Sequence, residues 1–134
     1  MPPLTGVLPV TVTNTGIAAN IEVNGADAVP GDGGTSWVLC NTGQNPAVAC
    51  TSNNGKSPGL NQYLLRNFGL DRAGLEGPGL TNSPTCDVAF RGESGCMAKS
   101  GVAKTEGIEL VGPSASADIS THWHITITWT PVPD

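Results

Sequence analysis

The two histidines of the chain are spaced to serve one metal ion. His122 and His124 are separated by one residue, and on a β-strand this spacing points both imidazoles to one side, with Cα atoms about 7 Å apart. Two ligands do not complete a site, and a third would come from a neighbouring chain or from Asp118, Glu106 or Glu109. We therefore interpret the histidines as solvent-facing side chains and keep a metal site as the alternative.

The catalytic constellations that can be proposed for this sequence are incomplete. The turn Gly92-Glu93-Ser94-Gly95 resembles the nucleophile turn of chymotrypsin-like proteases, but that chemistry needs a histidine base and an aspartate to orient it. Paired carboxylates for glycoside cleavage would be Asp27 with Asp32, or Glu106 with Glu109. These residues are explained more simply as charges on turns and on a strand face. The sequence thus predicts a protein that is not an enzyme and that has no cofactor.

Two further groups of residues have binding chemistry. The loop Asp27–Gly33 offers oxygen ligands for calcium, although it matches no calcium-loop pattern. A platform that stacks on sugar rings would be formed, if they were exposed, by Trp37, Tyr63, Trp123 and Trp129. The whole chain has only three tryptophans, one tyrosine and two phenylalanines, and a small core needs most of them. We expect these four side chains in the core and keep the binding platform as the alternative.

Four cysteines form two pairs with the same spacing, Cys40 with Cys50 and Cys86 with Cys96. Three disulfide connectivities are possible, and we favour the one that joins each local pair because it needs no long-range assumption. A zinc site held by the cysteines is disfavoured, since structural zinc ligands usually come in pairs two to four residues apart. Disulfides persist in oxidising compartments, which predicts a secreted or cell-surface protein.

Length and charge limit the partners of this protein. A chain of 134 residues fits a single domain, 1–134. Its net charge is −5 and its six basic residues lie in the middle of the sequence, so clustered cations that bind nucleic acid or anionic membranes are not expected. Membrane insertion is not expected either, because no apolar run is long enough, and the start has no signal-peptide pattern. If Met1 is the native start, a virion assembled inside a cell is the alternative location.

Strand patterns outweigh helix patterns in the first part of the chain. β-Branched residues alternate with small polar ones, and 18 glycines and 11 prolines interrupt the longer segments of the sequence. The alternation predicts strands over residues 8–13 and 17–23, paired as a hairpin through the turn at 14–16. Asn24-Gly25 is the strongest hairpin-turn signal, and a short strand is expected over 36–40.

The middle of the chain is less regular. Residues 41–57 have the composition of a surface loop, and residues 61–68 fit a short helix and a strand equally well. Glycine-leucine steps between residues 69 and 80 predict a looped excursion whose leucines contact the core. Short strands are expected over residues 86–90 and 108–111.

The last segment, residues 118–130, is the clearest strand. Trp123, Ile125, Ile127 and Trp129 share one face, and the histidines and threonines between them share the other. About seven to nine short strands predict an all-β fold, a two-sheet antiparallel β-sandwich of immunoglobulin-like or jelly-roll type with two disulfide-closed loops. A closed barrel is the alternative.

Two short motifs resemble the signatures of a known family. Trp37-Val38-Leu39, together with the terminal Ile127-Thr128-Trp129-Thr130, resembles the WxL family of Gram-positive cell-surface domains. The resemblance implies a secreted β-sandwich that is retained at the cell wall through non-covalent contacts with peptidoglycan or partner proteins, without catalysis.

These observations predict a non-enzymatic exported surface protein that binds a cell-wall component or a partner protein. One alternative is a structural subunit that assembles with copies of itself into a fibre, a surface layer or a virion decoration through open edge strands. The tail from Pro131 to Asp134 and the first 21 residues, which carry no charge, would provide such contacts. A second alternative is a secreted protease inhibitor whose loop from Asn41 to Ala49 docks in a protease cleft.

Overall fold

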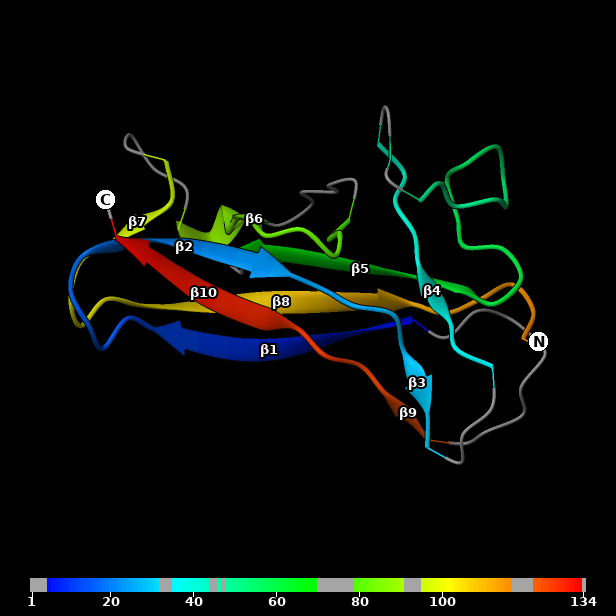
Figure 1. Cartoon of the computed structure of the whole chain (residues 1–134), viewed down its shortest axis with the longest axis horizontal. Helices are drawn as coiled ribbons and strands as arrows, with labels where there is room; N and C mark the ends of the chain where they lie inside the picture. The colour runs from blue at the N-terminus through cyan, green and yellow to red at the C-terminus, as the bar shows by residue number, and fades with distance from the viewer. Residues whose placement is uncertain are drawn as a thin grey trace.

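The computed structural model describes residues 5–31, 35–43, 46, 48–69, 79–90, 95–116 and 122–133. Within these ranges the chain forms ten β-strands and one turn of 3₁₀ helix, η1 (Val88–Phe90). Two principal sheets pack face to face in an elongated sandwich (Figure 1). The all-β class and the sandwich arrangement that the sequence predicts are therefore confirmed.

The larger sheet has the strand order β1-β8-β5-β4. Its members are β1 (Thr5–Thr13), β8 (Ala103–Val111), β5 (Gln62–Gly69) and β4 (Val38–Leu39). The pairs β1–β8 and β5–β8 are antiparallel, whereas β4 runs parallel to β5. The sheet is thus mixed at its β4 edge, where the sequence predicted antiparallel strands.

The second sheet lies in front of β8 and β5 in Figure 1. It consists of β10 (Thr128–Pro133), β2 (Ala19–Asn24) and β6 (Thr85–Cys86), with β7 (Met97–Ala98) also paired to β2. A small antiparallel ribbon of β3 (Val29–Pro30) and β9 (Trp123–His124) extends from the end of the molecule that lies away from β7 and the C-terminus (Figure 1). β1 and β10 are the edge strands on the same side of the sandwich.

The space between the sheets holds the hydrophobic core. Eight buried residues from both sheets and the connecting loops form its main cluster: Val23, Ala28, Trp37, Leu39, Tyr63, Leu65, Leu80 and Ile108. A second cluster lies toward β7 and consists of Ile21, Phe90, Cys96 and Ala98. Burial of this apolar surface is the main stabilising contribution to a small domain.

The predicted hairpin of residues 8–13 with 17–23 is wrong. β1 and β2 form at the expected positions, but β1 pairs with β8 and β2 pairs with β10. The turn between them carries the chain from one sheet to the other. Asn14 is only 6% exposed, and its Nδ2 donates to the carbonyl oxygens of Ile17 (2.8 Å) and Ala98 (2.9 Å). This buried amide holds the crossing in place.

Asn24-Gly25 does not form a hairpin turn either. Gly25 is buried, and its N–H donates to the carbonyl oxygen of Thr81 (2.8 Å). A Cβ atom added at Gly25 would lie 2.9 Å from Leu39 Cδ2. The glycine is therefore needed for a close approach to the core, and the chain continues from it toward β3.

The ambiguous segment 61–68 forms strand β5, so the strand alternative is confirmed. Leu65 packs between the two sheets, whereas the adjacent Leu64 packs on the opposite side of the strand against Cys40 and Cys50. A strand that is buried on both faces shows no alternation of apolar and polar residues. This double burial explains why its leucines resembled a helical pattern.

The later elements match the prediction in part. The strand expected over 86–90 ends at Cys86 and is followed by η1, whereas the strand expected over 108–111 lies within β8. From 122 to 130, exposed and half-buried residues alternate as predicted. The described part of this segment contains two strands, β9 and β10, and residues 118–121 lie outside the described ranges. In the glycine-leucine region, Leu80 is buried in the core, and residues 70–78 lie outside the described ranges.

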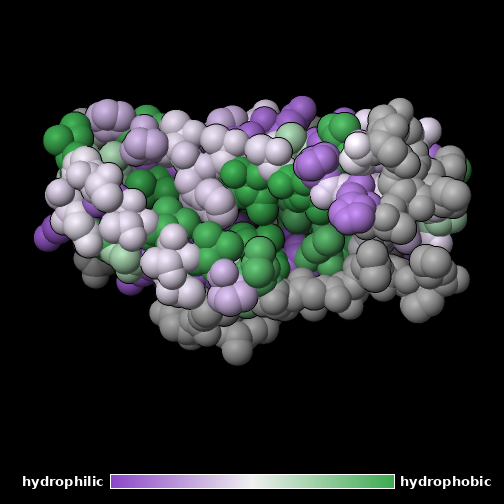
Figure 2. All heavy atoms as spheres, turned by 90° about the horizontal axis from the view of Figure 1, so that it is seen from below, coloured by the Kyte–Doolittle hydropathy of each residue, from purple (hydrophilic) through white to green (hydrophobic). Residues whose placement is uncertain are grey.

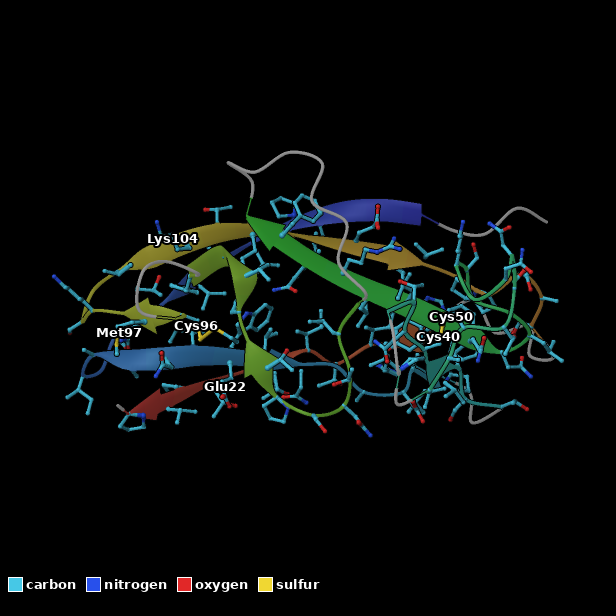
Figure 3. The ribbon with its side chains drawn as sticks, turned by 90° about the horizontal axis from the view of Figure 1, so that it is seen from above. Glu22, Cys40, Cys50, Cys96, Met97 and Lys104 are labelled. Atoms are coloured by element: carbon cyan, nitrogen blue, oxygen red, sulfur yellow. A yellow bond between two sulfur atoms is a disulfide. The ribbon has the colours of Figure 1, made fainter. Side chains whose placement is uncertain are left out.

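Both local disulfides are confirmed. Cys40 is bonded to Cys50 and Cys86 to Cys96, with Cα atoms 4.9 Å and 5.6 Å apart. They lie toward opposite ends of the long axis (Figure 3). Two disulfides indicate an oxidising, extracellular type of environment. No helix among the described residues is long and apolar enough to cross a bilayer.

Candidate functional site

One end of the sandwich is hollowed between the two sheet edges. β1 and β10 form its sides, and the turn from β1 to β2 closes it at the end where the C-terminus lies (Figure 1). The hollow measures about 360 Å³. It is lined by residues 12–17, 19, 21, 129–131 and 133, and we call it the edge groove. Ala19 and Ile21 of β2 are buried and form its floor.

The edge groove continues into an apolar strip along the open side of the sandwich. Leu8 on β1 is 64% exposed, and Val10, Ile125 and Ile127 are half-buried. Figure 2 views this side and shows hydrophobic side chains gathered in a band along the molecule. β10 crosses in front of β8 rather than β1 (Figure 1). The inner face of β1 therefore keeps apolar surface in contact with solvent.

The edge groove carries no ionisable side chain among its lining residues, although the whole protein has a net charge of −5. Its polar groups are hydroxyls of threonines, the amide of Asn14 and the backbone. Concave sites of this size with mostly apolar walls and a few polar groups are typical of ligand sites. The chemistry of the groove fits an uncharged ligand.

Trp129 connects the edge groove to a polar cluster inside the sandwich. Its indole ring lines the groove, while its Nε1–H donates to Asp87 Oδ2 (2.9 Å) and to Glu106 Oε2 (3.1 Å). The indole ring is thus fixed by hydrogen bonds from its N–H to two carboxyl groups on the side away from the groove. A tryptophan fixed in this way presents its apolar surface without losing side-chain freedom when a ligand binds.

The two carboxyl groups that hold Trp129 come from different elements and are both fully buried. Asp87 precedes η1 and Glu106 lies on β8, and each is 0% exposed. Asn67 of β5 bridges them, because its Nδ2 donates to Asp87 Oδ1 and to Glu106 Oε1, each at 3.0 Å. Asp87 Oδ1 also accepts the N–H of Ala89 (2.9 Å) at the start of η1. The network thus joins β5, β8, β10 and the start of η1.

This pair retains a proton at neutral pH. The pKa of Glu106 is raised from 4.5 to about 8, first by burial and then by its hydrogen bond to Asp87, while the donors Asn67 and Trp129 act in the opposite direction. Two carboxylates so close together cannot both be charged without a large cost. Neither carboxyl group has exposed surface, so the pair positions Trp129 and does not contact a molecule in the groove.

Of the four predicted aromatic binding residues, two lie inside the core. Trp37 and Tyr63 are 6% and 0% exposed, and the hydroxyl of Tyr63 donates to the carbonyl oxygen of Ala26. Trp123 is half-buried and stacks on Trp37 with ring centroids 3.8 Å apart. These positions favour the core interpretation for this cluster. Trp129 is separate from it and lies at the edge groove.

Both predicted metal ligands are on the surface. His122 and His124 are exposed at the β9 end of the molecule, and the described ranges contain no group of three potential metal ligands. Of the suggested third ligands, Glu106 belongs to the buried pair and Glu109 forms an ion pair with Arg66 (2.8 Å). Asp118 lies outside the described ranges.

The remaining predicted chemistry is not assembled in the described part of the chain. Glu106 and Glu109 are three residues apart on β8, so they project to opposite faces and cannot act as a pair. Asp27 Oδ1 accepts the N–H of Leu39 (2.9 Å). Asp32 and the segment 91–94, which includes most of the proposed nucleophile turn, lie outside the described ranges.

Sequence reasoning identified only part of this site. Trp129 was proposed as a binding residue, whereas Asp87 and Asn67 were not singled out. Glu106 was considered as a metal ligand, as one of a catalytic pair and as a strand-face charge, but not as a buried residue. One signal was available, because Glu106 shares the inner face of its strand with Ile108. A carboxylate in such a position indicates a buried polar network.

No protein-family model matches this chain, and neither the curated proteins nor the solved structures include a match. A function for the protein is therefore inferred from the geometry of the edge groove.

Proposed function

We propose that this protein is a non-enzymatic, exported binding protein, and that the edge groove is its binding site for a partner protein or a cell-wall component. The observation that carries the proposal is the setting of Trp129. Its ring lines a hollow of about 360 Å³ that has apolar walls, and its N–H is held by two buried carboxyl groups. Rigid aromatic side chains in such pockets commonly supply much of the binding energy of an interface.

Two further features support export and binding rather than catalysis. The disulfides Cys40–Cys50 and Cys86–Cys96 fit a protein that works outside a reducing cytosol. The titratable pair Asp87 and Glu106, which is the strongest candidate for acid–base chemistry among the described residues, has no exposed surface. A general acid or base has to come within hydrogen-bond distance of a substrate.

The proposal is tested with an exposed residue at the groove and a matched control elsewhere. Ile17 lines the groove and is 70% exposed, and Leu60 is 62% exposed and lies outside the groove. Lysine at either position should leave the fold intact, because surface substitutions of this kind change stability little. Only Ile17→Lys would place a charge in the uncharged groove.

Binding is measured by co-sedimentation with purified peptidoglycan and insoluble polysaccharides, and on an array of immobilised peptides. We expect at least one of these to bind the wild-type protein and Leu60→Lys equally, and to bind Ile17→Lys at least tenfold more weakly. If both variants lost binding equally, the binding site would not be the edge groove. Absence of binding to every surface tested would remove the proposal.

Self-assembly is a second candidate function, because β1 leaves an open edge beside the apolar strip. Leu8, at 64% exposure, lies on this edge strand. Unpaired edge strands with exposed apolar residues are the usual route by which sheet proteins associate. Sedimentation equilibrium at rising protein concentration measures self-association. A protein that stays monomeric at millimolar concentration would exclude this function.

A further inference from the structure

We infer that the edge groove receives an extended, uncharged polypeptide segment of a partner protein, which adds as a strand to the free edge of β1 and turns alternate apolar side chains toward Trp129. This inference rests on the proposed function and names its ligand class. It follows from the backbone groups on the two edges of the groove and from the charge of its walls.

The free edge of β1 presents backbone groups to a new strand. Asn14 donates its backbone N–H to the carbonyl oxygen of Val102 (2.9 Å), in continuation of the register of β1 with β8. Successive residues of a strand direct their backbone groups to opposite sides. Val12 lies two residues before Asn14, so its backbone N–H and C=O also face β8. Thr11 and Thr13 flank Val12 and have the opposite orientation. Their N–H and C=O groups therefore point outward, along the open side of the groove.

Prolines remove most of the backbone donors from the free edge of β10, where Trp129 is the one outward-facing residue of the strand that keeps an N–H. On β2, Ile21 donates its N–H to Cys96 O (3.0 Å) and accepts from Asp87 N (2.8 Å), on the side away from β10. Pro131 lies opposite Ile21, so its ring nitrogen faces away from β2, and Pro133 has the same orientation. A proline nitrogen has no hydrogen to donate. An incoming strand therefore finds more hydrogen-bond donors on β1 than on β10.

The length of this edge limits the contact to a few residues. Pro9 faces outward on β1 as Thr11 and Thr13 do, and it interrupts the row of donors. Side chains on one face of a strand are about 7 Å apart. A segment of about five residues thus places two or three side chains over the hollow and the adjoining strip.

The charge of the walls selects the kind of segment. No lining residue of the edge groove is ionisable, and the first 21 residues of the chain carry no charge. A charged side chain turned inward would lose its hydration without gaining a partner. The inward positions of the incoming segment are therefore apolar, and its outward positions are free to be polar.

The test uses the whole protein with its disulfides intact and a fluorescent peptide of seven alternating threonines and valines with one lysine at each end. We expect binding to slow hydrogen exchange of the Thr11 and Thr13 amides at least tenfold. Thr11→Pro removes one outward donor and repeats the arrangement of Pro9, so the fold should be kept. It should weaken binding at least tenfold, whereas Thr11→Val retains the N–H and should bind within about threefold of wild type.

Several outcomes would overturn the inference. Absence of peptide binding, or binding that leaves both amides exchanging at their free rate, would show that no strand is added to β1. The exchange measurement on the wild-type protein decides this even if Thr11→Pro fails to fold. If peptidoglycan or polysaccharide binds in a way that is sensitive to Ile17→Lys while the peptide does not bind, the proposed function stands and the strand inference fails. If Thr11→Pro converts a dimer to a monomer, the occupant is a second copy of the chain instead.

Discussion

Replacing Glu106 with glutamine tests the buried carboxyl pair behind Trp129. An unfolded glutamate ionises near pH 4.5, whereas burial and the neighbouring Asp87 raise the pKa of Glu106 to about 8 in the folded protein. Between these values the folded state binds more protons than the unfolded state, so the free energy of unfolding falls as pH rises. The slope is about 1.4 kcal/mol per pH unit. The loss between pH 5 and pH 8 is then about 3 to 4 kcal/mol.

Glu106→Gln removes this dependence, because the glutamine amide does not ionise. We expect the free energy of unfolding of the variant to stay nearly constant from pH 5 to pH 8, apart from contributions that it shares with the wild type. The assay is urea unfolding at pH 5, 6, 7 and 8, followed by tryptophan fluorescence without reductant. Glu109→Gln is the control, since it removes a half-buried carboxylate from the outer face of the same strand, where it pairs with Arg66, and it should keep the wild-type slope.

Two results would refute this reasoning. One is a wild-type free energy of unfolding that stays flat or rises from pH 5 to pH 8. The other is a Glu106→Gln variant with the same slope as the wild type. Either would show that the pair formed with Asp87 does not retain a proton in the folded state.

Two further variants examine the crossing between the sheets and the disulfides. Asn14→Ala loses hydrogen bonds to Ile17 O and Ala98 O and should lower the free energy of unfolding by about 2 to 4 kcal/mol in urea; a loss below about 0.5 kcal/mol would contradict a structural role. Replacing Cys40 and Cys50 together by alanine should cost about 2 to 3 kcal/mol. Alkylation of the unreduced wild-type protein should add no label by intact mass, since all four cysteines are paired, and labelling of all four would contradict both disulfides.

The positions of strands were easier to predict than their partners. The alternation of Leu8, Val10 and Val12 identified β1, because one-sided burial leaves a period of two in the sequence. The same pattern does not show which strand lies alongside, and β1 pairs with β8, about a hundred residues later, rather than with β2. In β5 the alternation fails, since Leu64 and Leu65 are buried on opposite faces.

The candidate site was harder to predict than the fold. Trp129 was identified as a possible binding residue from its type, and Glu106 from its charge, but neither observation linked them. Asn67 and Asp87 complete the network from β5 and from the start of η1. These four residues span more than sixty positions of the chain, and no local spacing relates them.

The amino-acid sequence by itself determined the all-β class, the two local disulfides and the uncharged character of the N-terminal segment. Each of these depends on residues that are near one another in the chain, so the pattern is visible without the fold. Only the tertiary structure decided which strands became edges, left the groove between β1 and β10 open, and buried Asp87 beside Glu106. Those features depend on contacts between segments that are far apart in the chain and that bury one another from water. No single stretch of sequence contains both partners of such a contact.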